Sequence, residues 1–347
     1  MPVSFGHLTS LQLPSHATEL VRLEHSLELP SLTNRLRQSP RLILGSGSNL
    51  VVRSTENEPL DVTVIRNDIR GIVRLPADGN AVGIRCAAGE NWHRFVMWTL
   101  SQGLGGLENL SLIPGTVGAA PIQNIGAYGV ELSERVSAVH AWDFEAATHR
   151  VFGLTECAFG YRSSRFKDPS RQGPWNRPRY LITAVDFALW PAHRAPRVVH
   201  YPGLEGLCAN GPEAPMQIAH AVMSLRRKKL PDPDQIANVG SFFQNPQVPA
   251  PVAASLLETH PTMPVHPGAD GVKLSAGWLI DSLGLKGSRH GQAGVYDHHA
   301  LVLVNHGGAS AEELLWLARD IQQRVLARYG VWLEPEPTIV PPVERPA

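Results

Sequence analysis

Apolar residues between positions 1 and 70 form short runs separated by polar or glycine-rich stretches. The segment from His16 to Glu24 has helical spacing, and we expect a helix there. Apolar runs at 41–44, 50–52 and 62–65 have the length of buried strands, and the first ends in a turn rich in glycine and serine at 45–49. This part of the chain therefore predicts a small α/β module.

From about Gly71 the spacing of apolar residues changes. A strand is expected at 81–87, and Gly89 leads into a helix from Glu90 that Gly103 ends. Further strands are expected at 136–142, 149–153 and 180–189, with a loop rich in proline and arginine at 167–179. The apolar face of the helix repeats at helical spacing and comprises Trp92, Phe95, Val96, Thr99 and Leu100.

The last third of the chain predicts a second α/β region. A helical pattern ends in the basic run 226–229, which is typical of a solvated helix C-terminus, and two prolines then mark a domain boundary. Helices are expected at 251–259 and 274–283, and strands at 300–304 and 331–333. A long helix begins at Ser310, where Glu313 completes a capping box, and ends at Gly330.

Composition favours a globular protein that binds a small molecule. Hydrophobic residues make up 43% of the 347 positions and charged residues 18%, whereas a disordered chain would have far less apolar content. The 31 basic residues balance the 31 acidic ones, so the chain lacks the basic excess that is typical of nucleic-acid-binding proteins.

Cysteine usage and the N-terminus favour a cytoplasmic protein. Cys86, Cys157 and Cys208 are far apart, without a C-x-x-C pair, which indicates a reducing compartment rather than a disulfide framework or a zinc site. The N-terminus lacks a signal-peptide pattern, and the uncharged stretch 109–130 contains prolines and glycines that exclude a membrane helix. The histidines lack metal-ligand spacing, so we expect no metal.

The segment 103–129 is unusual because it contains seven glycines and a single charge, Glu108. Ordering such a stretch costs much conformational entropy. We interpret it as a wrap around a large, flat, partly apolar ligand with a phosphate tail; the alternative is an Ω-loop packed on its own side chains. The turn at 45–49 can form a phosphate nest, but it lacks a Rossmann fingerprint, and a plain tight turn is the alternative.

Three polar groups are candidates for chemistry. Arg162 is a forked donor suited to a carboxylate, with a solvated arginine turn as the alternative. Ser241 stands between Gly240 and two phenylalanines, and no nucleophile elbow surrounds it. We interpret it as a proton donor; an N-cap or turn serine is the alternative. Glu336, with Glu334 before the intervening proline, ends an expected strand, and both side chains would point to one face.

Taken together, these residues resemble the UDP-N-acetylenolpyruvoylglucosamine reductase (MurB) family. The similarity runs from about Leu42 to Glu336 with the order of the motifs preserved. The matching stretches are Gly45-Ser46-Gly47-Ser48-Asn49, Gly89-Glu90-Asn91-Trp92-His93, 105–129 with Ile113-Pro114-Gly115 and Gln123 to Gly129, Phe159-Gly160-Tyr161-Arg162, Lys229-Leu230-Pro231-Asp232-Pro233, Gly240-Ser241-Phe242-Phe243, 276–281 and 332–336.

The resemblance implies an α+β fold, in which a two-domain FAD-binding fold of the vanillyl-alcohol-oxidase type precedes a C-terminal α/β substrate-binding domain. Residues 1–70 and 71–225 would form the two FAD-binding subdomains, 229–330 the substrate-binding domain, and the C-terminal strand 331–347 would return to the second subdomain. Residues implied to bind FAD non-covalently are Gly45, Ser46, Gly47, Ser48, Asn49, Ile113, Gly115, Thr116, Gly118, Ala119, Ala120, Ile122, Asn124, Ile125 and Gly126.

The implied reaction is the NADPH-dependent reduction of UDP-N-acetylglucosamine enolpyruvate to UDP-N-acetylmuramate in peptidoglycan synthesis. Arg162 would stabilise the enolate-like charge, Glu336 would orient and polarise the group, and Ser241 would protonate the carbon. We expect a monomer with neither a nucleic-acid nor a membrane partner. Residues implied to contact the substrate or the nicotinamide cofactor are Tyr128, Tyr161, Tyr201, Lys229, Asn245, His266 and His299; the loops with Tyr161 and Tyr201 resemble the subtype that clamps the UDP diphosphate.

Some positions depart from the family pattern. Gln244 replaces a common lysine, which puts a charge role at this position in doubt. His266 replaces a common tyrosine and His299 a common glutamine, and we expect these changes to alter nicotinamide or uridine contacts without abolishing the reaction. Two alternatives stay open. An FAD-dependent oxidase of the same fold would often attach its flavin to a histidine or cysteine, and His93 is present. A non-catalytic nucleotide-sugar-binding protein would be expected to lose one of the three catalytic candidates.

Overall fold

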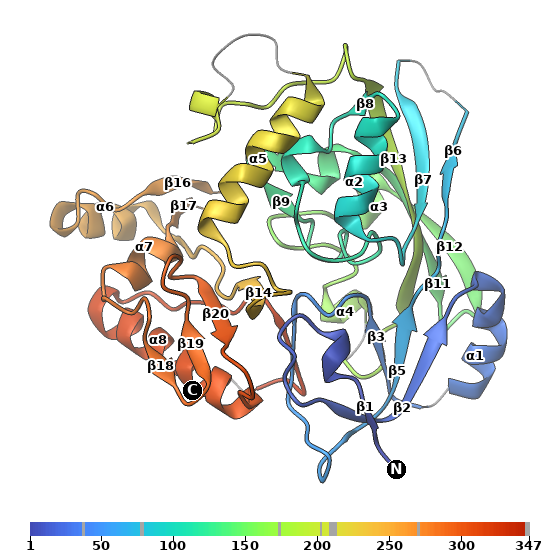
Figure 1. Ribbon diagram of the computed structural model, residues 1–347, viewed down its shortest axis with the longest axis horizontal. Coiled ribbons are helices and arrows are strands. Elements are labelled where there is room, and N and C mark those ends of the chain that lie inside the picture. Colours follow the sequence, from blue (N-terminus) through green and yellow to red (C-terminus); the bar gives the residue numbers. More distant parts are fainter. Residues whose placement is uncertain are drawn as a thin grey trace. The chain divides into compact units, whose positions relative to one another are not determined.

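The chain forms two compact units, each built from separate stretches of sequence. The computed structural model describes residues 1–36, 39–76, 80–172, 175–201, 203–207, 214–268 and 271–343, so Cys208 and the last four residues lie outside it. Unit 1 comprises Met1, 17–46 and 61–228, and unit 2 comprises 2–16, 47–60 and 229–347 (Figure 1).

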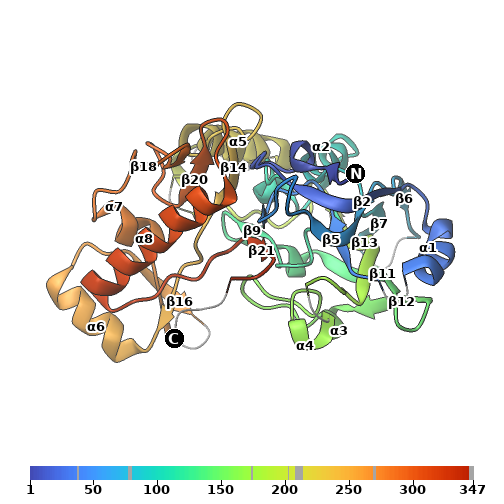
Figure 2. The same ribbon diagram turned by 90° about the horizontal axis from the view of Figure 1, so that it is seen from below.

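Unit 1 is built around a six-stranded sheet with the order β12-β11-β13-β7-β6, to which β8 adds by pairing with β13 (Figures 1 and 2). The long strand β13 pairs antiparallel with β11 on one side and with β7 on the other. Strands predicted near 81–87, 136–142, 149–153 and 180–189 are therefore confirmed. The bounds are β6 Ile72–Arg74, β7 Val82–Ala87, β8 Leu104–Gly105, β11 Val136–Asp143, β12 Thr148–Gly153 and β13 Tyr180–Pro191.

Helix α2, Trp92–Ser101, buries the face that the sequence predicts, and Trp92 is only 1% exposed. Its N-cap Asn91 accepts a hydrogen bond from the Arg94 backbone N–H, which satisfies one of the free amides of the first turn. Gly103 follows with φ +70°, a left-handed conformation that glycine adopts without a Cβ penalty. The indole N–H of Trp92 donates to the Leu110 carbonyl at 2.9 Å and so anchors the glycine-rich segment to the core.

A smaller sheet in unit 1 corrects the first prediction. The segment expected to form a helix from 16 to 24 is strand β2, His16–Leu23, in a sheet that continues through β5, Leu60–Asn67, to β3, Arg41–Leu44. The Thr18 hydroxyl donates to the Val62 carbonyl of β5 at 2.8 Å. Pairing with β5 outweighs the local helical spacing, because strand formation depends on neighbours distant in sequence. The strands predicted at 41–44 and 62–65 are present.

The remaining elements of unit 1 are short, except for one helix. The predicted loop 167–179 contains a short helix, α4, in addition to irregular backbone. Helix α5 ends at Lys229, within the predicted basic run. The bounds are α1 Leu29–Leu36, α3 Leu154–Cys157, α4 Pro169–Gln172, α5 Pro215–Lys229, β9 Gly126–Ala127 and β10 Val130–Glu131.

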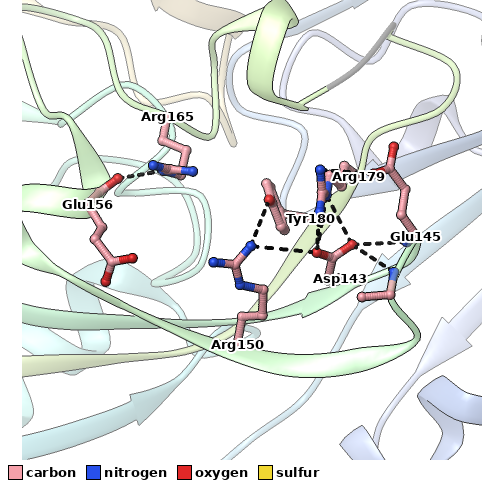
Figure 3. Close-up of polar contacts among 8 residues, drawn as sticks. Asp143, Glu145, Arg150, Glu156, Arg165, Arg179 and Tyr180 are labelled. Atoms are coloured by element: carbon pink, nitrogen blue, oxygen red, sulfur yellow. Dashed lines mark hydrogen bonds and ion pairs between the residues drawn. The ribbon is translucent and has the colours of Figure 1, made fainter.

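A buried carboxylate fixes the end of β11. Asp143 accepts hydrogen bonds from the Arg179 guanidinium, the shortest at 2.8 Å, and from the backbone N–H groups of Glu145 and Ala146 (Figure 3). Burial alone would raise the pKa of Asp143, but these donors together lower it below its ordinary value. Arg179 also contacts the Glu145 carboxylate at 2.9 Å, and the network closes the turn into β12.

Unit 2 contains a four-stranded sheet with the order β14-β20-β19-β18 and a three-stranded sheet with the order β15-β17-β16. Helix α8 packs on β18, β19 and β20 (Figure 2). The bounds are β14 Ala237–Ser241, β15 Gln247–Val248, β16 Val265–Gly268, β17 Gly271–Leu274, β18 Arg289–His290, β19 Ala293–Val295, β20 Val302–Asn305, α6 Ala250–Thr259, α7 Ala276–Asp281 and α8 Ala311–Tyr329.

The predicted capping box of α8 is present. The Ser310 hydroxyl accepts from the Glu313 N–H at 3.1 Å, and the Glu313 carboxylate accepts from the Ser310 N–H at 3.0 Å. Gly330 ends the helix in a left-handed conformation, as predicted. The helix predicted at 274–283 is shorter than expected, since Ser275 caps it.

Two N-terminal segments complete unit 2. Leu11, Leu13 and Val51 lie in its hydrophobic core, and the Asn305 amide donates to the Leu11 carbonyl at 2.9 Å. The segment 2–16 contains β1, Val3–Ser4. Strand β4, Leu50–Val52, is present as predicted and pairs in parallel with β21, Thr338–Val340.

The end of the chain corrects two predictions. Residues 331–333 are not a strand; the first regular strand after α8 is β21. Its partner is β4 in unit 2, and not a strand between 71 and 225, because the backbone of Leu50–Val52 offers an edge of matching length. The division into three domains stays a prediction.

Cys86 and Cys157 are buried and free in the structure, and burial raises the pKa of both thiols. Within the described ranges, none of the helices has the length and apolar character needed to cross a membrane.

Candidate active site

The resemblance assigns two glycine-containing turns to the cofactor, and the first two residues of one, Gly45 and Ser46, lie in unit 1 together with the other. Gly45 follows β3, and a Cβ added to it would lie 2.7 Å from the Thr116 hydroxyl oxygen and 3.8 Å from the Ala119 Cβ. The end of β3 therefore approaches the loop 115–119 so closely that a larger residue at position 45 would displace Thr116.

The loop 115–119 lies directly on the turn between β7 and α2. The Gly118 N–H donates to the Ala88 carbonyl at 2.8 Å, and the Val117 N–H donates to the Glu90 carbonyl at 2.9 Å. A Cβ on Gly118 would stand 2.5 Å from the Ala88 Cβ. The close approach explains why glycine is required at 118.

These turns suit the diphosphate of FAD, the cofactor that the resemblance implies. The Ser46 hydroxyl is buried and has no hydrogen-bond partner in the described part of the chain, which is costly unless a ligand or water supplies one. Gly115 has φ +136°, open to glycine but not to other residues. Glycine backbone N–H groups and a hydroxyl without a partner can donate hydrogen bonds to phosphate oxygens.

The second half of the 45–49 turn belongs to unit 2. The Asn49 side-chain amide donates to the Glu336 carbonyl at 3.3 Å, and the Asn49 carbonyl accepts from the Thr338 N–H at 3.0 Å. Asn49 therefore holds the backbone of a predicted catalytic residue. Whether Gly47, Ser48 and Asn49 contact FAD stays a prediction.

The other predicted cofactor residues lie along the segment 113–126 of unit 1. Ile113 and Ile125 are partly buried against the unit 1 core, Ala120 is buried, and Ile122 is 37% exposed. Asn124 is completely buried at φ +45°, and its carboxamide bonds to other protein groups.

Arg162 lies in a tight turn. Gly160 and Ser163 exchange backbone hydrogen bonds of 3.0 and 3.2 Å, and Arg162 between them has φ +51°. Its guanidinium donates to the Gly126 carbonyl at 3.1 Å and lies 5.2 Å from the ring centroid of Tyr161. The planar group is thus held next to the predicted cofactor segment of the same unit.

Ser241 and Glu336 are neighbours in unit 2. Ser241 ends β14, and the buried Phe242 follows it. The Glu336 N–H donates to the Phe242 carbonyl at 2.8 Å, and the Gln244 N–H donates to the Glu334 carbonyl at 2.9 Å. The backbone bridge between 242–244 and 334–336 thus joins Glu336 to the residue that follows Ser241.

Further predicted substrate residues lie on other elements of unit 2. His299 lies in the turn before β20, and burial, followed by the charges of Lys229 and Lys286, lowers its pKa. The Asn245 side-chain oxygen accepts from the Ala276 N–H at 2.9 Å, at the start of α7. His266 is exposed on β16, where it pairs with Lys273 of β17.

Two predicted substrate residues of unit 1, Tyr128 and Tyr201, lie near helix α5, which carries Arg226. Tyr128 and Tyr201 pack edge to face with ring centroids 5.1 Å apart. Tyr128 also packs against the cluster of Leu204 with Ile218 and Val222 of α5. Arg226 continues that face one turn later and carries a charge that acts on Tyr128.

Arg226 corrects the interpretation of the run 226–229 as fully solvated. Arg227 and Lys228 are exposed, but Arg226 is partly buried, and burial lowers its pKa. No carboxylate among the described residues forms an ion pair with it. The spacing 218, 222 and 226 already places it on the buried face, a pattern that the basic character of the run masks.

The structure thus groups the predicted residues by unit. Unit 1 holds Arg162, Gly45, Ser46, the segment 113–126 and the three predicted tyrosines, while unit 2 holds 47–49, Lys229, Ser241, Glu336, Asn245, His266 and His299. The convergence of the three catalytic candidates on one substrate stays a prediction.

Comparison with known proteins places the chain in a family. The C-terminal domain of UDP-N-acetylenolpyruvoylglucosamine reductase matches residues 232–340, and an FAD binding domain matches residues 20–151. The proteins named UDP-N-acetylenolpyruvoylglucosamine reductase from Azoarcus sp. (strain BH72) and Chromobacterium violaceum are each 48% identical to the chain. The alignments cover 96% of both chains for the first, and 93% of this chain and 94% of the relative for the second.

A solved structure agrees with these sequence matches. The crystal structure of UDP-N-acetylenolpyruvylglucosamine reductase (MurB) from Thermus caldophilus is 26% identical and matches with a TM-score of 0.66 over 98% of each chain. The predicted α+β fold with an FAD-binding region is confirmed by these matches. With relatives at this identity over nearly its whole length, the chain belongs to the UDP-N-acetylenolpyruvoylglucosamine reductase family.

Proposed function

We propose that the chain reduces UDP-N-acetylglucosamine enolpyruvate to UDP-N-acetylmuramate in peptidoglycan synthesis, with NADPH as the hydride donor and non-covalently bound FAD. The observation that supports the proposal is the backbone bridge in unit 2 between 242–244, next to Ser241, and 334–336, which contains Glu336, since the reaction needs a proton donor and an acidic group together. Bound FAD would supply the relay of the hydride from NADPH to the enolpyruvyl double bond.

Each of the three catalytic candidates has a distinct task in this proposal. Hydride addition to the terminal carbon leaves negative charge on the neighbouring carbon and its carboxylate. The Arg162 guanidinium offers a planar fork that stabilises this charge. The Ser241 hydroxyl then donates its proton to the carbon, and Glu336 orients and polarises the reacting group. The bonds of the Glu336 backbone to Phe242 and Asn49 hold the backbone from which that carboxylate extends.

The phosphates of the substrate require cationic and hydrogen-bonding groups. We assign this task to Tyr128, Tyr201, Lys229 and, in addition, Arg226. A partly buried guanidinium without an ion-pair partner in the described chain favours an anionic ligand, because an uncompensated buried charge is costly. Asn245, His266 and His299 would contact the rest of the substrate or the nicotinamide, and Tyr161 would close the site beside Arg162.

The oxidase alternative finds little support at His93. Its Nδ1 accepts a hydrogen bond from the Leu112 N–H at 3.1 Å, so the ring helps to order the glycine-rich segment. Burial, with the charges of Arg227 and Arg226, lowers the pKa of His93. We further propose that the protein is cytoplasmic and that it is a monomer. Sedimentation of the purified chain would test the oligomeric state.

The proposed function is tested with the purified full chain. It should bind FAD and oxidise NADPH only when the enolpyruvyl UDP-sugar is present. In Ser241→Ala, flavin reduction by NADPH should persist, while reoxidation by the substrate should slow by ~10²–10⁴-fold, as expected on removing a positioned proton donor. The exposed Ser31→Ala serves as a matched control. A chain that takes up no FAD, or a Ser241→Ala variant with unchanged turnover, would contradict the proposal.

A further inference from the structure

The segment 122–126, assigned to the cofactor, is joined to the turn that carries Arg162 by three hydrogen bonds within unit 1. The Asn124 Nδ2 donates to the Gly160 carbonyl at 3.1 Å, the Arg162 Nη2 donates to the Gly126 carbonyl at 3.1 Å, and the Ser164 hydroxyl donates to the Ile122 carbonyl at 2.6 Å. The bonds reach both ends of the turn and the guanidinium itself. Any shift of one segment is therefore transmitted to the other.

Asn124 is the centre of this junction. Its side chain is fully buried, its Nδ2 also donates to the Glu131 carboxylate at 2.9 Å, and its Oδ1 accepts from the Ser133 N–H at 2.9 Å. Acceptors on one side and a donor on the other fix the orientation of the carboxamide. The left-handed backbone at φ +45° favours asparagine over most other residues. Both the side chain and the backbone of position 124 thus suit asparagine.

The Arg162 turn needs such support. Arg162 itself has φ +51°, a sparsely populated conformation for a residue with a Cβ, and it persists only where surrounding bonds enforce it. The mutual bonds of Gly160 and Ser163 close the turn, and Asn124 binds the carbonyl of Gly160, where the turn begins. Asn124 therefore bonds to the start of the turn from which the Arg162 guanidinium extends.

We propose that Asn124 is a positioning residue for the reaction: it fixes the Arg162 guanidinium and couples its placement to the order of the cofactor segment. This inference rests on the proposed function, because it assumes that Arg162 stabilises charge on the substrate. The Asn124 carboxamide does not touch the reacting atoms. It acts through Gly160, and cofactor binding to 122–126 would order Arg162 at the same time.

The test uses Asn124→Asp in the full-length protein with FAD bound. Aspartate keeps the shape, the tolerance of a left-handed backbone and the acceptor for Ser133, but loses both donors and faces the Glu131 carboxylate. Stopped-flow measurement should show reoxidation by the enolpyruvyl UDP-sugar slowing by about ten- to a hundredfold, the range for a lost buried hydrogen bond, and slowing more than flavin reduction by NADPH. Asn80→Asp, at an exposed position, is the matched control.

A double-mutant cycle with Arg162→Lys separates positioning from general damage. If Asn124 acts through the guanidinium fork, the penalty of Asn124→Asp on reoxidation should largely vanish in the Arg162→Lys background. An Asn124→Asp enzyme that reoxidises at the parental rate, or a penalty that simply adds to that of Arg162→Lys, overturns the inference.

A second variant covers the case in which Asn124→Asp does not fold. Ser164→Ala removes the bond that its hydroxyl donates to the Ile122 carbonyl and the bond that it accepts from the Phe166 N–H, but leaves the bonds of Asn124 in place. It should show the same coupling to Arg162→Lys with a smaller penalty; an additive penalty overturns the inference here too. Failure of the proposed function looks different, because the parental protein itself would then lack FAD or would not be reoxidised by the UDP-sugar.

Discussion

Replacement of Gly118 by alanine tests whether the loop 115–119 holds FAD. The added Cβ would lie 2.5 Å from the Ala88 Cβ and 3.1 Å from both the Cα and the carbonyl oxygen of Ala88. Carbon atoms in favourable contact are about 3.5–4.0 Å apart, so the loop must move by roughly 1 Å. Ala88 cannot rotate away, since the clash involves its backbone and its only side-chain atom. Gly118 is not left-handed, so the effect is steric.

The expected cost follows from this overlap. Adding a methyl group to a packed site costs about 1–3 kcal/mol. Because the neighbouring Thr116 and Ala119 contact Gly45 in the same cradle, a displaced loop should transfer most of that cost to FAD binding. Since about 1.4 kcal/mol is tenfold in affinity, the dissociation constant for FAD should rise by about ten- to a hundredfold.

Fluorescence titration of the apoprotein with FAD measures this change. Gly206→Ala is the matched control, since a Cβ there meets nothing within 4 Å and the backbone is not left-handed. Ala88→Gly in the Gly118→Ala background removes the closest contact and should restore much of the affinity. Parental FAD affinity in Gly118→Ala, or no recovery in the double variant, would refute the assignment of this loop to the cofactor.

Three further predictions concern other parts of the molecule. Arg85 and His140 bond to Asp186 and, against the effect of burial, lower its pKa from 3.8 to about 2. At pH values above 3.8 the charged carboxylate therefore stabilises the fold by about 2 kcal/mol. This stabilisation is lost as the pH falls from 3.8 towards 2. Urea unfolding of Asp186→Asn should show that loss already at neutral pH, and an unchanged free energy of unfolding would contradict it. Burial raises the pKa of Cys157 to about 12, so a thiol reagent followed by mass spectrometry should modify it at neutral pH only after unfolding; labelling of the native protein would speak against this. Ser310→Ala should lower the free energy of unfolding by about 1 kcal/mol, and equal stability would mean that the capping box is dispensable.

Elements governed by local sequence were predictable. Helix α2 shows its buried face in the spacing of Trp92, Phe95 and Val96, and α8 shows its start in Ser310 and Glu313. These features depend on contacts within one or two turns, which a single sequence displays.

Features that depend on distant partners were not predictable. Strand β2 was expected to be a helix because its pairing with β5 cannot be read from its own residues. Arg226 was hidden in a run of charges, although its helical face is buried. The motifs indicate candidate site residues, but the backbone bridge that joins 242–244 to 334–336 is a long-range contact that no local pattern displays.

The pairing of β4 with β21 bears on how the protein is made. Leu50–Val52 leaves the ribosome long before its parallel partner Thr338–Val340 is synthesised. Until then an apolar strand edge stays open, which during translation invites non-native association. A fragment that starts at residue 232, where the match to the C-terminal family domain begins, would also lack β4, Leu11 and Leu13. All three belong to unit 2. Expression of that fragment alone should therefore give an unstable product, and only a full-length chain should be used for crystallisation or ligand screening.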